Sequence, residues 1–295
     1  MALDHFRKVD DLEISEKSRN DFVSNADRGV ELLLRQAITR DFPEDGIMGE
    51  EYGHEPGHSG ITWVIDPIDG TANFVRGRPH WCVSIACLSG AEIMAGCIYD
   101  PVHDELYLAG STTASTRNGK PIHVTTTADI DRATVGVGLK PSKGDSSGLV
   151  MLTPMVEAGA RLYRNSSGAL SLAYVADGRL DAYVERHMHS WDFFAGALIV
   201  RKAGGFMRDF DPAAALTAGA PVIASNGVLD LRLACARANR VAGRIEDAAR
   251  AISTGDYYDG LALSRAGAMI DAARRGMRCV SRFVLTASPD ASNSR

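Results

Sequence analysis

A chain of 295 residues, 45% of them hydrophobic and 23% charged, is long and apolar enough to bury a sizeable core. Its formal net charge of −5 and isoelectric point near 5.9 argue against a general binder of nucleic acids or anionic membranes. Five cysteines, an odd number without close pairs, are typical of free thiols rather than of disulfides or a zinc site.

The N-terminus and the hydropathy pattern indicate where in the cell the protein is expected. Residues 1–11 carry charges where a secretory signal would need an apolar core. No apolar stretch reaches the roughly 20 residues that a membrane-spanning helix requires. We therefore expect a cytoplasmic protein with neither a membrane nor a nucleic-acid partner.

The first half of the chain predicts one helix followed by a sheet. Apolar residues between 27 and 39 follow helical spacing, with Asp27 placed to cap the start or accept contacts there, and Pro43 ends the helix. Turn signals separate four further segments that are typical of strands, so we expect a consecutive, largely antiparallel sheet. These segments are residues 61–66, 82–88, 93–99 and 105–109.

The second half alternates helices with strands. A sheet followed by such alternation is typical of a layered α/β (α+β) sandwich. The hydrophobic pattern predicts strands at 132–139, 181–185 and 221–224, and helices at 148–160, 170–176 and 192–203.

Carboxylates at the end of an apolar strand are the most informative feature of the chain. Asp66 falls where the expected strand stops, Pro67 forces a turn, and Asp69 follows three residues after Asp66. Gly70 lets the backbone approach a ligand closely, and Thr71 adds a hydroxyl group. This arrangement is typical of a site for a hard metal ion.

Two other acidic segments extend this pattern. Glu50 and Glu51 follow Gly49 after the expected first helix, and Asp192 follows Trp191 at the start of an Ala- and Gly-rich helix. Alone, the glutamate pair is more typical of a solvated loop, and Asp192 is as typical of a helix N-cap. Oxygen ligands without a Cys or His cluster favour magnesium or manganese over zinc.

In this order and spacing, the segments around Glu50, Asp66 and Asp192 resemble the inositol monophosphatase family of magnesium-dependent, lithium-sensitive sugar and polyol phosphatases. Weaker similarity runs from about residue 21 to residue 226. The resemblance implies a layered αβαβα sandwich, a homodimer, and hydrolysis of a small phosphate monoester, foremost an inositol monophosphate or a related polyol or sugar phosphate. It also implies two or three Mg²⁺ ions, with Mn²⁺ as a substitute, and a metal-activated water in place of a covalent phosphoenzyme.

The resemblance assigns the metal ligands residue by residue. Glu50 and Asp66, together with the carbonyl group of Ile68, would hold the first ion. Asp66, Asp69 and Asp192 would hold the second ion. Asp66 would therefore bridge the two ions.

The resemblance implies catalytic roles for Glu50, Thr71 and Asp27. Glu50 and Thr71 would position the nucleophilic water on the first ion. Asp27 would hydrogen-bond Thr71 or help to hold a weaker third ion. The backbone N–H groups of Gly70 and Thr71 would open a helix and point at the phosphate.

Substrate contacts are expected from several segments. Glu185 matches the family carboxylate that hydrogen-bonds a sugar or inositol hydroxyl, and Asp69 would serve both metal and substrate. The family commonly has Gly-Ser/Thr-Ala where this chain has Ser166-Ser167-Gly168, so the chain departs from the family at the substrate-facing backbone of Ser167 and Gly168.

The residues leave several functions open. Asn73-Phe74 favours the inositol or histidinol phosphatase branches over the nucleotidases, residues 75–81 suit the histidinol branch, and residues 96–101 read more like inositol phosphatases. Histidinol-phosphate phosphatase is thus the first alternative, followed by fructose-1,6-bisphosphatase and 3′-phosphoadenosine nucleotidase. The alternative from another class is a regulatory, protein-binding homologue, against which the intact acidic residues argue.

Both ends depart from the family pattern. Only about twenty residues precede the similar region, where the family has a long helix, and the chain continues well past the predicted helix at 229–241. We expect an N-terminal α+β half with the metal motifs, a C-terminal α/β half, and an atypical helical extension with a disordered tail. These regions are residues 1–130, 131–242 and 243–295.

An amphipathic segment in this extension suggests a replacement for the missing N-terminal helix. Residues 260–275 are Ala-rich and present an apolar stripe at helical spacing. Without some cover, the apolar face of the helix at 27–39 would be exposed to solvent. Our hypothesis is that residues 260–275 supply that cover, in the same subunit or in a partner.

Overall fold

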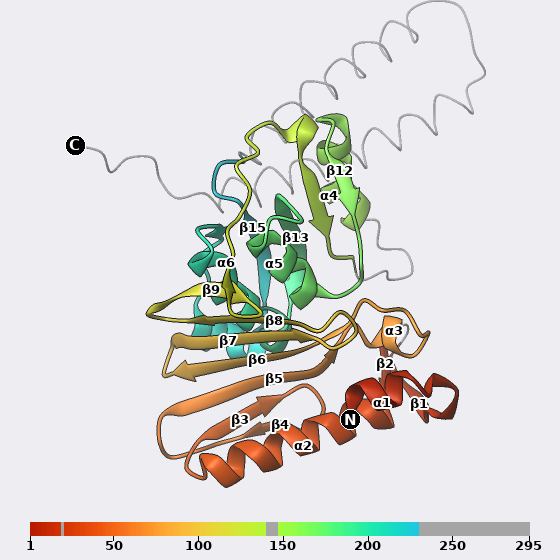
Figure 1. Cartoon of the computed structure of the whole chain (residues 1–295), viewed down its shortest axis with the longest axis vertical. Helices are drawn as coiled ribbons and strands as arrows, with labels where there is room; N and C mark the ends of the chain where they lie inside the picture. The colour runs from red at the N-terminus through yellow and green to blue at the C-terminus, as the bar shows by residue number, and fades with distance from the viewer. Residues whose placement is uncertain (19–20, 140–146, 230–295) are drawn as a thin grey trace, which may run out of the picture. The chain divides into compact units, whose positions relative to one another are not determined.

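The computed structural model describes residues 1–18, 21–139 and 147–229 (Figure 1). The chain divides into two compact units, of which the first consists of residues 1–126, 136–139 and 163–227 and the second of residues 127–135, 140–162 and 228–295. Every predicted site residue belongs to the first unit. The predicted helix at 229–241, apart from Leu229, and the segment 260–275 lie outside the described residues.

Helix α2 (Asn25–Asp41) confirms the first predicted helix and begins at Asn25 rather than at Asp27. The Ser24 hydroxyl accepts a hydrogen bond from the Ala26 amide at 3.2 Å, and Asp27 accepts one from the Ser24 amide at 2.8 Å. This capping box satisfies amide groups that the start of a helix would leave unpaired. Upstream lie the short elements α1 (Ala2–Phe6), η1 (Val9–Asp11), β1 (Ile14–Ser18) and β2 (Asp21–Ser24).

An eight-stranded sheet forms the centre of the first unit, in the order β10-β9-β8-β7-β6-β5-β3-β4. Its consecutive strands from β5 to β10 pair antiparallel, as predicted, whereas β3 pairs parallel to β5. The sequence pattern missed four shorter strands, namely β3, β4, β9 and β10. The strands are β3 (Gly46–Gly49), β4 (Gly53–Glu55), β5 (Ile61–Asp69), β6 (Cys82–Ser89), β7 (Glu92–Asp100), β8 (Glu105–Gly110), β9 (Thr113–Arg117) and β10 (Lys120–Pro121).

Strand β5 corrects one prediction, because it continues through Asp69 instead of ending at Asp66. Asp66 pairs with Ser84 and Asp69 pairs with Cys82, so three steps along β5 match two steps along β6. One extra residue is therefore inserted in β5 as a β-bulge. Pro67, which has no amide hydrogen to donate, lies within this irregular stretch.

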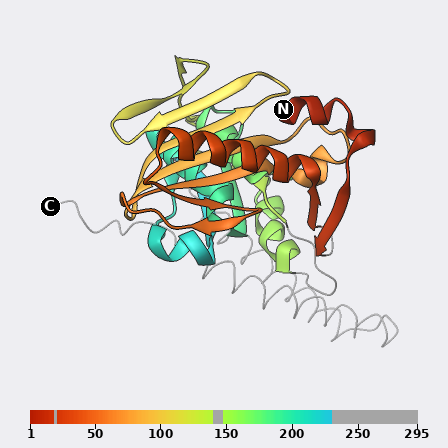
Figure 2. The ribbon, with the colours of Figure 1, turned by 90° about the horizontal axis from the view of Figure 1, so that it is seen from below.

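Helices cover both faces of this sheet. Side chains alternate along β5, so that Ile65 packs with Ile38 of α2 while Val64 belongs to the large core cluster on the opposite face. That cluster contains the buried hydrophobic residues of α5 (Gly168–Ala176) and α6 (Ser190–Lys202). Figure 2 looks onto α2 with the strands of the sheet behind it.

A second sheet lies on the other side of α5 and α6. Tyr183 and Val222 of this sheet belong to the same core cluster as the two helices. The first unit thus contains four layers, in the order helix, sheet, helices, sheet, of the expected sandwich, and the α+β class is confirmed. Its remaining elements are β13 (Ala182–Met188), β14 (Phe206–Met207) and β15 (Ala220–Ser225), which pair antiparallel, and the helices α3 (Thr71–Phe74) and α7 (Pro212–Ala218).

The second unit contains few described elements, and two of them, the strands β11 and β12, include residues that belong to the first unit. The predicted strand at 132–139 is shorter in the structure, where β11 spans Thr134–Val137 and is preceded by η2 (Ile130–Arg132). The predicted helix is α4 (Ser147–Glu157), which is followed by β12 (Arg161–Tyr163). Among the described helices of both units, none is long and apolar enough to cross a membrane.

Candidate metal centre

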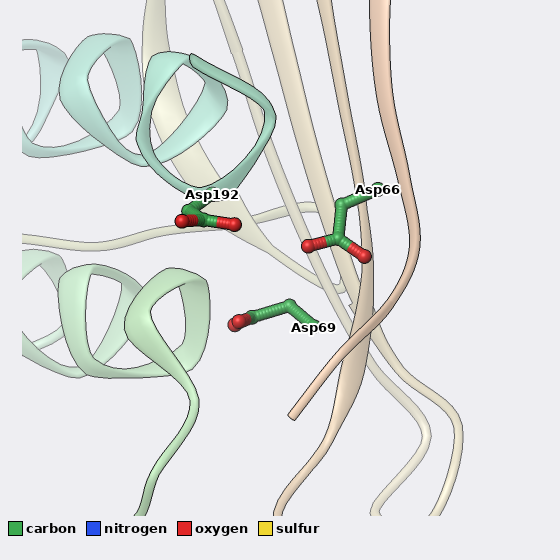
Figure 3. A group of neighbouring side chains, drawn as sticks. All are labelled: Asp66, Asp69 and Asp192. Atoms are coloured by element: carbon green, nitrogen blue, oxygen red, sulfur yellow. The ribbon is translucent and has the colours of Figure 1, made fainter. Parts of the chain in front are cut away.

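Three carboxylates from two distant segments converge in the first unit. Asp66 and Asp69 lie on the bulged end of β5, and Asp192 lies in the first turn of α6. One oxygen from each side chain lies within 4.8 Å of the others (Figure 3). On a regular strand, residues three apart face opposite sides, so the extra residue in β5 is what allows Asp66 and Asp69 to share this space.

The electrostatics of this cluster favour a bound cation. Burial raises the pKa of the Asp66 carboxyl well above its usual range, and the charges of Glu50, Asp69 and Asp192 raise it further. Burial also raises the pKa of Asp69. A cation between these groups would offset both the mutual repulsion and the cost of burying the charges. Because all the groups are oxygen ligands, they fit a hard divalent ion.

Glu50 lies beside this cluster but outside the group of three. It follows directly after β3, and its amide donates a hydrogen bond to the carbonyl of Ile65 at 3.3 Å. Its side chain is half-buried, and its charge is the largest single carboxylate contribution to the raised pKa of Asp66. The fourth predicted carboxylate is therefore close enough to act on the cluster.

The N-terminus of α5 holds Asp69 in place. The Ser167 hydroxyl donates a hydrogen bond to Asp69 at 2.5 Å, and the amides of Ala169 and Gly168 donate at 2.7 Å and 3.3 Å. Amide groups at a helix N-terminus favour a negative charge. Ser167 and Gly168, which sequence analysis assigned to the substrate, thus contact the carboxylate of Asp69.

A buried hydrogen-bond network connects α2 to the turn after β5. The Thr71 hydroxyl lies 3.1 Å from Asp27 Oδ1 and 3.0 Å from the carbonyl oxygen of Ile68. The other oxygen of Asp27 accepts from the amide and hydroxyl of Ser24 at 2.8 and 2.6 Å. Burial raises the pKa of Asp27, and the hydrogen bonds from Ser24 and Thr71 partly offset that increase.

Gly70 joins this network to α3. Its φ of 98° lies in the left-handed region, and a Cβ atom at this position would lie 2.8 Å from the His80 carbonyl oxygen. A side chain would be both strained and crowded there. Glycine is therefore required where the chain passes from β5 into the first turn of α3, which begins at Thr71.

Glu185 lies on β13 together with Tyr183, whose hydroxyl is close enough to the acidic cluster for the cluster's charges to act on it. The Tyr183 hydroxyl donates a hydrogen bond to Glu185 at 2.6 Å. Burial raises the pKa of Tyr183, and the charges of Glu185, Asp69 and Asp192 raise it further. Tyr183 was not predicted from the sequence, although it lies two residues before Glu185 and therefore on the same face of the strand.

The fold and the site define a layered α+β protein with a buried, oxygen-rich centre suited to a metal ion. A model of the inositol monophosphatase family matches residues 1–242, and the chain belongs to this family. Nus factor SuhB of Xylella fastidiosa is 38% identical over 212 residues, which are 71% of this chain and 77% of the relative.

Solved structures agree with this assignment. The extragenic suppressor protein SuhB of Bartonella henselae matches with a TM-score of 0.73 and 31% identity, covering 81% of this chain and 91% of that protein. An inositol monophosphatase of Thermotoga maritima matches with a TM-score of 0.70 and 31% identity, covering 83% and 93% of the two chains. The resemblance inferred from the sequence is thereby confirmed.

Proposed function

We propose that this protein is a magnesium-dependent phosphatase that hydrolyses a small phosphate monoester, foremost an inositol monophosphate or a related polyol or sugar phosphate. The observation that carries the proposal is the convergence of Asp66, Asp69 and Asp192 within 4.8 Å. Membership of the inositol monophosphatase family supports it. A homodimer in the cytoplasm remains part of this proposal.

The proposed ligand sets share one residue. Asp66, Asp69 and Asp192 would hold one Mg²⁺ ion, and Glu50, Asp66 and the Ile68 carbonyl would hold another. When bound, such ions lower the pKa of a coordinated water and neutralise phosphate oxygens. Mn²⁺ would substitute because it takes the same oxygen ligands.

The protein groups around these ligands would orient the reactants. Thr71 has one hydroxyl proton, and donating it to Asp27 rather than to Ile68 leaves the Ile68 carbonyl more available to a cation. Thr71, with Glu50, would then position the attacking water by accepting a hydrogen bond from it. Asp27 acts in this proposal as the group that orients the Thr71 hydroxyl.

The alcohol part of the substrate would be recognised on β13. We assign Glu185 as the acceptor for a substrate hydroxyl group, with the Tyr183 hydroxyl fixing the direction of its carboxylate. The amides of Gly70 and Thr71 would donate to phosphate oxygens. Ser167 and Gly168 would contribute through their hydrogen bonds to Asp69.

A panel of phosphate esters tests this proposal. We expect phosphate release from inositol 1-phosphate in the presence of Mg²⁺, and none after chelation with EDTA. Histidinol phosphate, fructose 1,6-bisphosphate and adenosine 3′,5′-bisphosphate test the alternative substrates in the same assay. Inhibition by lithium would indicate the lithium-sensitive branch of the family.

A regulatory role is the second candidate. It is favoured by the name Nus factor, which curated relatives carry, including the SuhB protein of Xylella fastidiosa. Absence of phosphate release from every ester, in protein that still binds the metal ion, would favour this role over the phosphatase.

A further inference from the structure

A buried ion pair on α2 has no place in the proposed chemistry, yet it reaches the segment that carries Glu50. The side chain of Glu31 is fully buried, and that of Arg35 is 10% exposed. Arg35 Nε donates to Glu31 Oε1 at 2.8 Å. Burying such a pair is costly unless further hydrogen bonds satisfy its remaining groups, so the other partners of this pair are informative.

Glu31 holds the backbone immediately after Glu50. Its Oε2 accepts from the Glu51 amide at 2.7 Å, and its Oε1 accepts from the Tyr52 amide at 3.1 Å. A Cβ atom on Gly49 would lie 2.1 Å from Glu31 Oε1, so the missing side chain of Gly49 makes room for this carboxylate. Glu31 therefore contacts the chain on both sides of Glu50.

Arg35 makes further contacts with the same turn and with β4. Its guanidinium group donates to the carbonyl of Gly53 and, at 3.3 Å, to the carboxylate of Glu55. It also lies 5.9 Å from the centre of the Tyr52 ring. Through these hydrogen bonds, the ion pair links the turn between β3 and β4 to α2.

The strand register explains why this turn matters. Gly49 of β3 pairs with Ile65 of the parallel strand β5, so the next residues along the two strands are Glu50 and Asp66. Adjacent residues in a parallel pair project to the same face. Because β3 ends at Gly49, the path of the following turn decides where the Glu50 carboxylate lies relative to Asp66.

We propose that Glu31, held by Arg35, is a positioning residue that fixes the turn after Gly49 and thereby directs the Glu50 carboxylate toward Asp66. This inference rests on the proposed metal-dependent function. Groups that orient a metal ligand without touching the metal typically change affinity by about 10- to 100-fold when removed. Glu31 acts here through the backbone of Glu51 and Tyr52.

The test measures Mn²⁺ binding to the full chain by titration calorimetry and electron paramagnetic resonance. We expect Glu31→Gln to weaken Mn²⁺ binding at one site by about tenfold, because an amide cannot accept from all three donors. Glu50→Gln should weaken the same site. The double variant should bind no more weakly than Glu50→Gln alone, because Glu31 acts through Glu50. Excess Mg²⁺ should restore kcat in Glu31→Gln.

Control variants separate positioning from general stability. Arg40→Gln breaks the exposed Arg40–Asp41 pair on the same helix and should leave Mn²⁺ affinity unchanged. Thermal unfolding in EDTA checks that each variant folds. If Glu31→Gln does not fold, Arg35→Lys takes its place in the cycle, because it keeps the charge but loses the branched guanidinium contacts.

The outcomes distinguish two failures. Unchanged Mn²⁺ affinity in Glu31→Gln, or additive losses in the double variant, would overturn the positioning role while Glu50→Gln still supports the metal centre. Wild-type affinity in both Glu50→Gln and Asp66→Asn would overturn the metal centre, and the positioning role with it.

Discussion

A single inserted residue determines how two carboxylates share one site. Asp66 and Asp69 are separated by an odd number of residues, and on a regular strand their side chains would point to opposite faces. The extra residue in the β5 bulge brings both side chains to the same face of the strand. The folded protein thus concentrates negative charge in a buried place, at a cost to stability that a cation would offset.

At this scale we expect Asp66→Asn to have opposite effects on stability and activity. The Ile68 amide can still donate to the Asn oxygen as it does to Asp66 at 2.9 Å, so the turn is kept while a repelling charge is lost. The metal-free variant should melt a few degrees higher than the wild type. The proposed magnesium-dependent turnover should fall at least about 100-fold, because bound metal ions typically contribute several kcal/mol to such catalysis.

The pH dependence follows from the raised pKa of Asp66. The folded metal-free protein binds the Asp66 proton more tightly than the unfolded chain, so its stability falls as the pH rises through and above the usual Asp range. In Asp66→Asn, the free energy of unfolding should decrease less as the pH rises. Thermal unfolding in EDTA from pH 4 to pH 8 measures it, with Asp209→Asn, whose side chain is 99% exposed, as the control. Near wild-type activity in Asp66→Asn would contradict the site assignment.

At the scale of elements, helix termini connect the two halves of the site. Ser167 is the N-cap of α5, where its oxygen accepts from the Leu170 amide at 3.3 Å and its proton goes to Asp69. Asp192 accepts from the His189 amide at 3.0 Å at the start of α6. Helix capping and placement of the carboxylates are thus performed by the same residues.

We therefore expect Ser167→Ala to reduce both stability and metal affinity. Loss of the cap should lower the free energy of unfolding by about 0.5–2 kcal/mol, and loss of the bond to Asp69 should weaken Mn²⁺ binding about tenfold. Urea unfolding and calorimetry measure the two effects.

A matched control exists at α7, whose N-cap is Asp211. Asp211 accepts from the Ala213 amide at 3.0 Å and takes no part in the acidic cluster. Asp211→Ala should lose similar stability and keep full metal affinity. Equal metal affinity in Ser167→Ala and the wild type would show that Ser167 serves α5 alone.

At the scale of the molecule, the outer face of α2 exposes apolar side chains. Val30 and Ile38 are buried beneath the helix, but the neighbouring Leu32 and Leu33 are 47% and 49% exposed in the described part of the chain. Adjacent exposed leucines on a helix are a liability for a soluble protein when nothing covers them. Val30, Leu34 and Ile38 of the stripe that the hypothesis left uncovered are packed, and Leu33 is exposed, so cover by residues 260–275 stays a prediction.

Truncation after Val241 tests that hypothesis. We expect the shortened protein to aggregate or to run as a monomer instead of the proposed dimer, as measured by size-exclusion chromatography with light scattering. Replacing Leu32 and Leu33 by Gln in the truncated chain should restore solubility, because it removes the exposed apolar surface. A truncated protein that is soluble, fully stable and active without these replacements would refute the idea.

The sequence by itself determined the features that depend on local patterns. Helical spacing placed α2 and α6, turn signals between strand-like segments placed β5 to β8, and the order of the acidic motifs indicated the family. Such signals are local because backbone hydrogen bonding and burial repeat with the period of a helix or a strand.

The tertiary structure decided the rest. It placed Ser167 against Asp69 across 98 residues, extended β5 through a bulge, and used Glu31 to hold the turn beside Glu50. None of these follows from periodicity, because each depends on which distant groups meet once the sheet and helices pack. A buried carboxylate needs hydrogen-bond donors, and the fold supplies them from segments that are far apart in the sequence. Local sequence patterns do not show which of these segments come together.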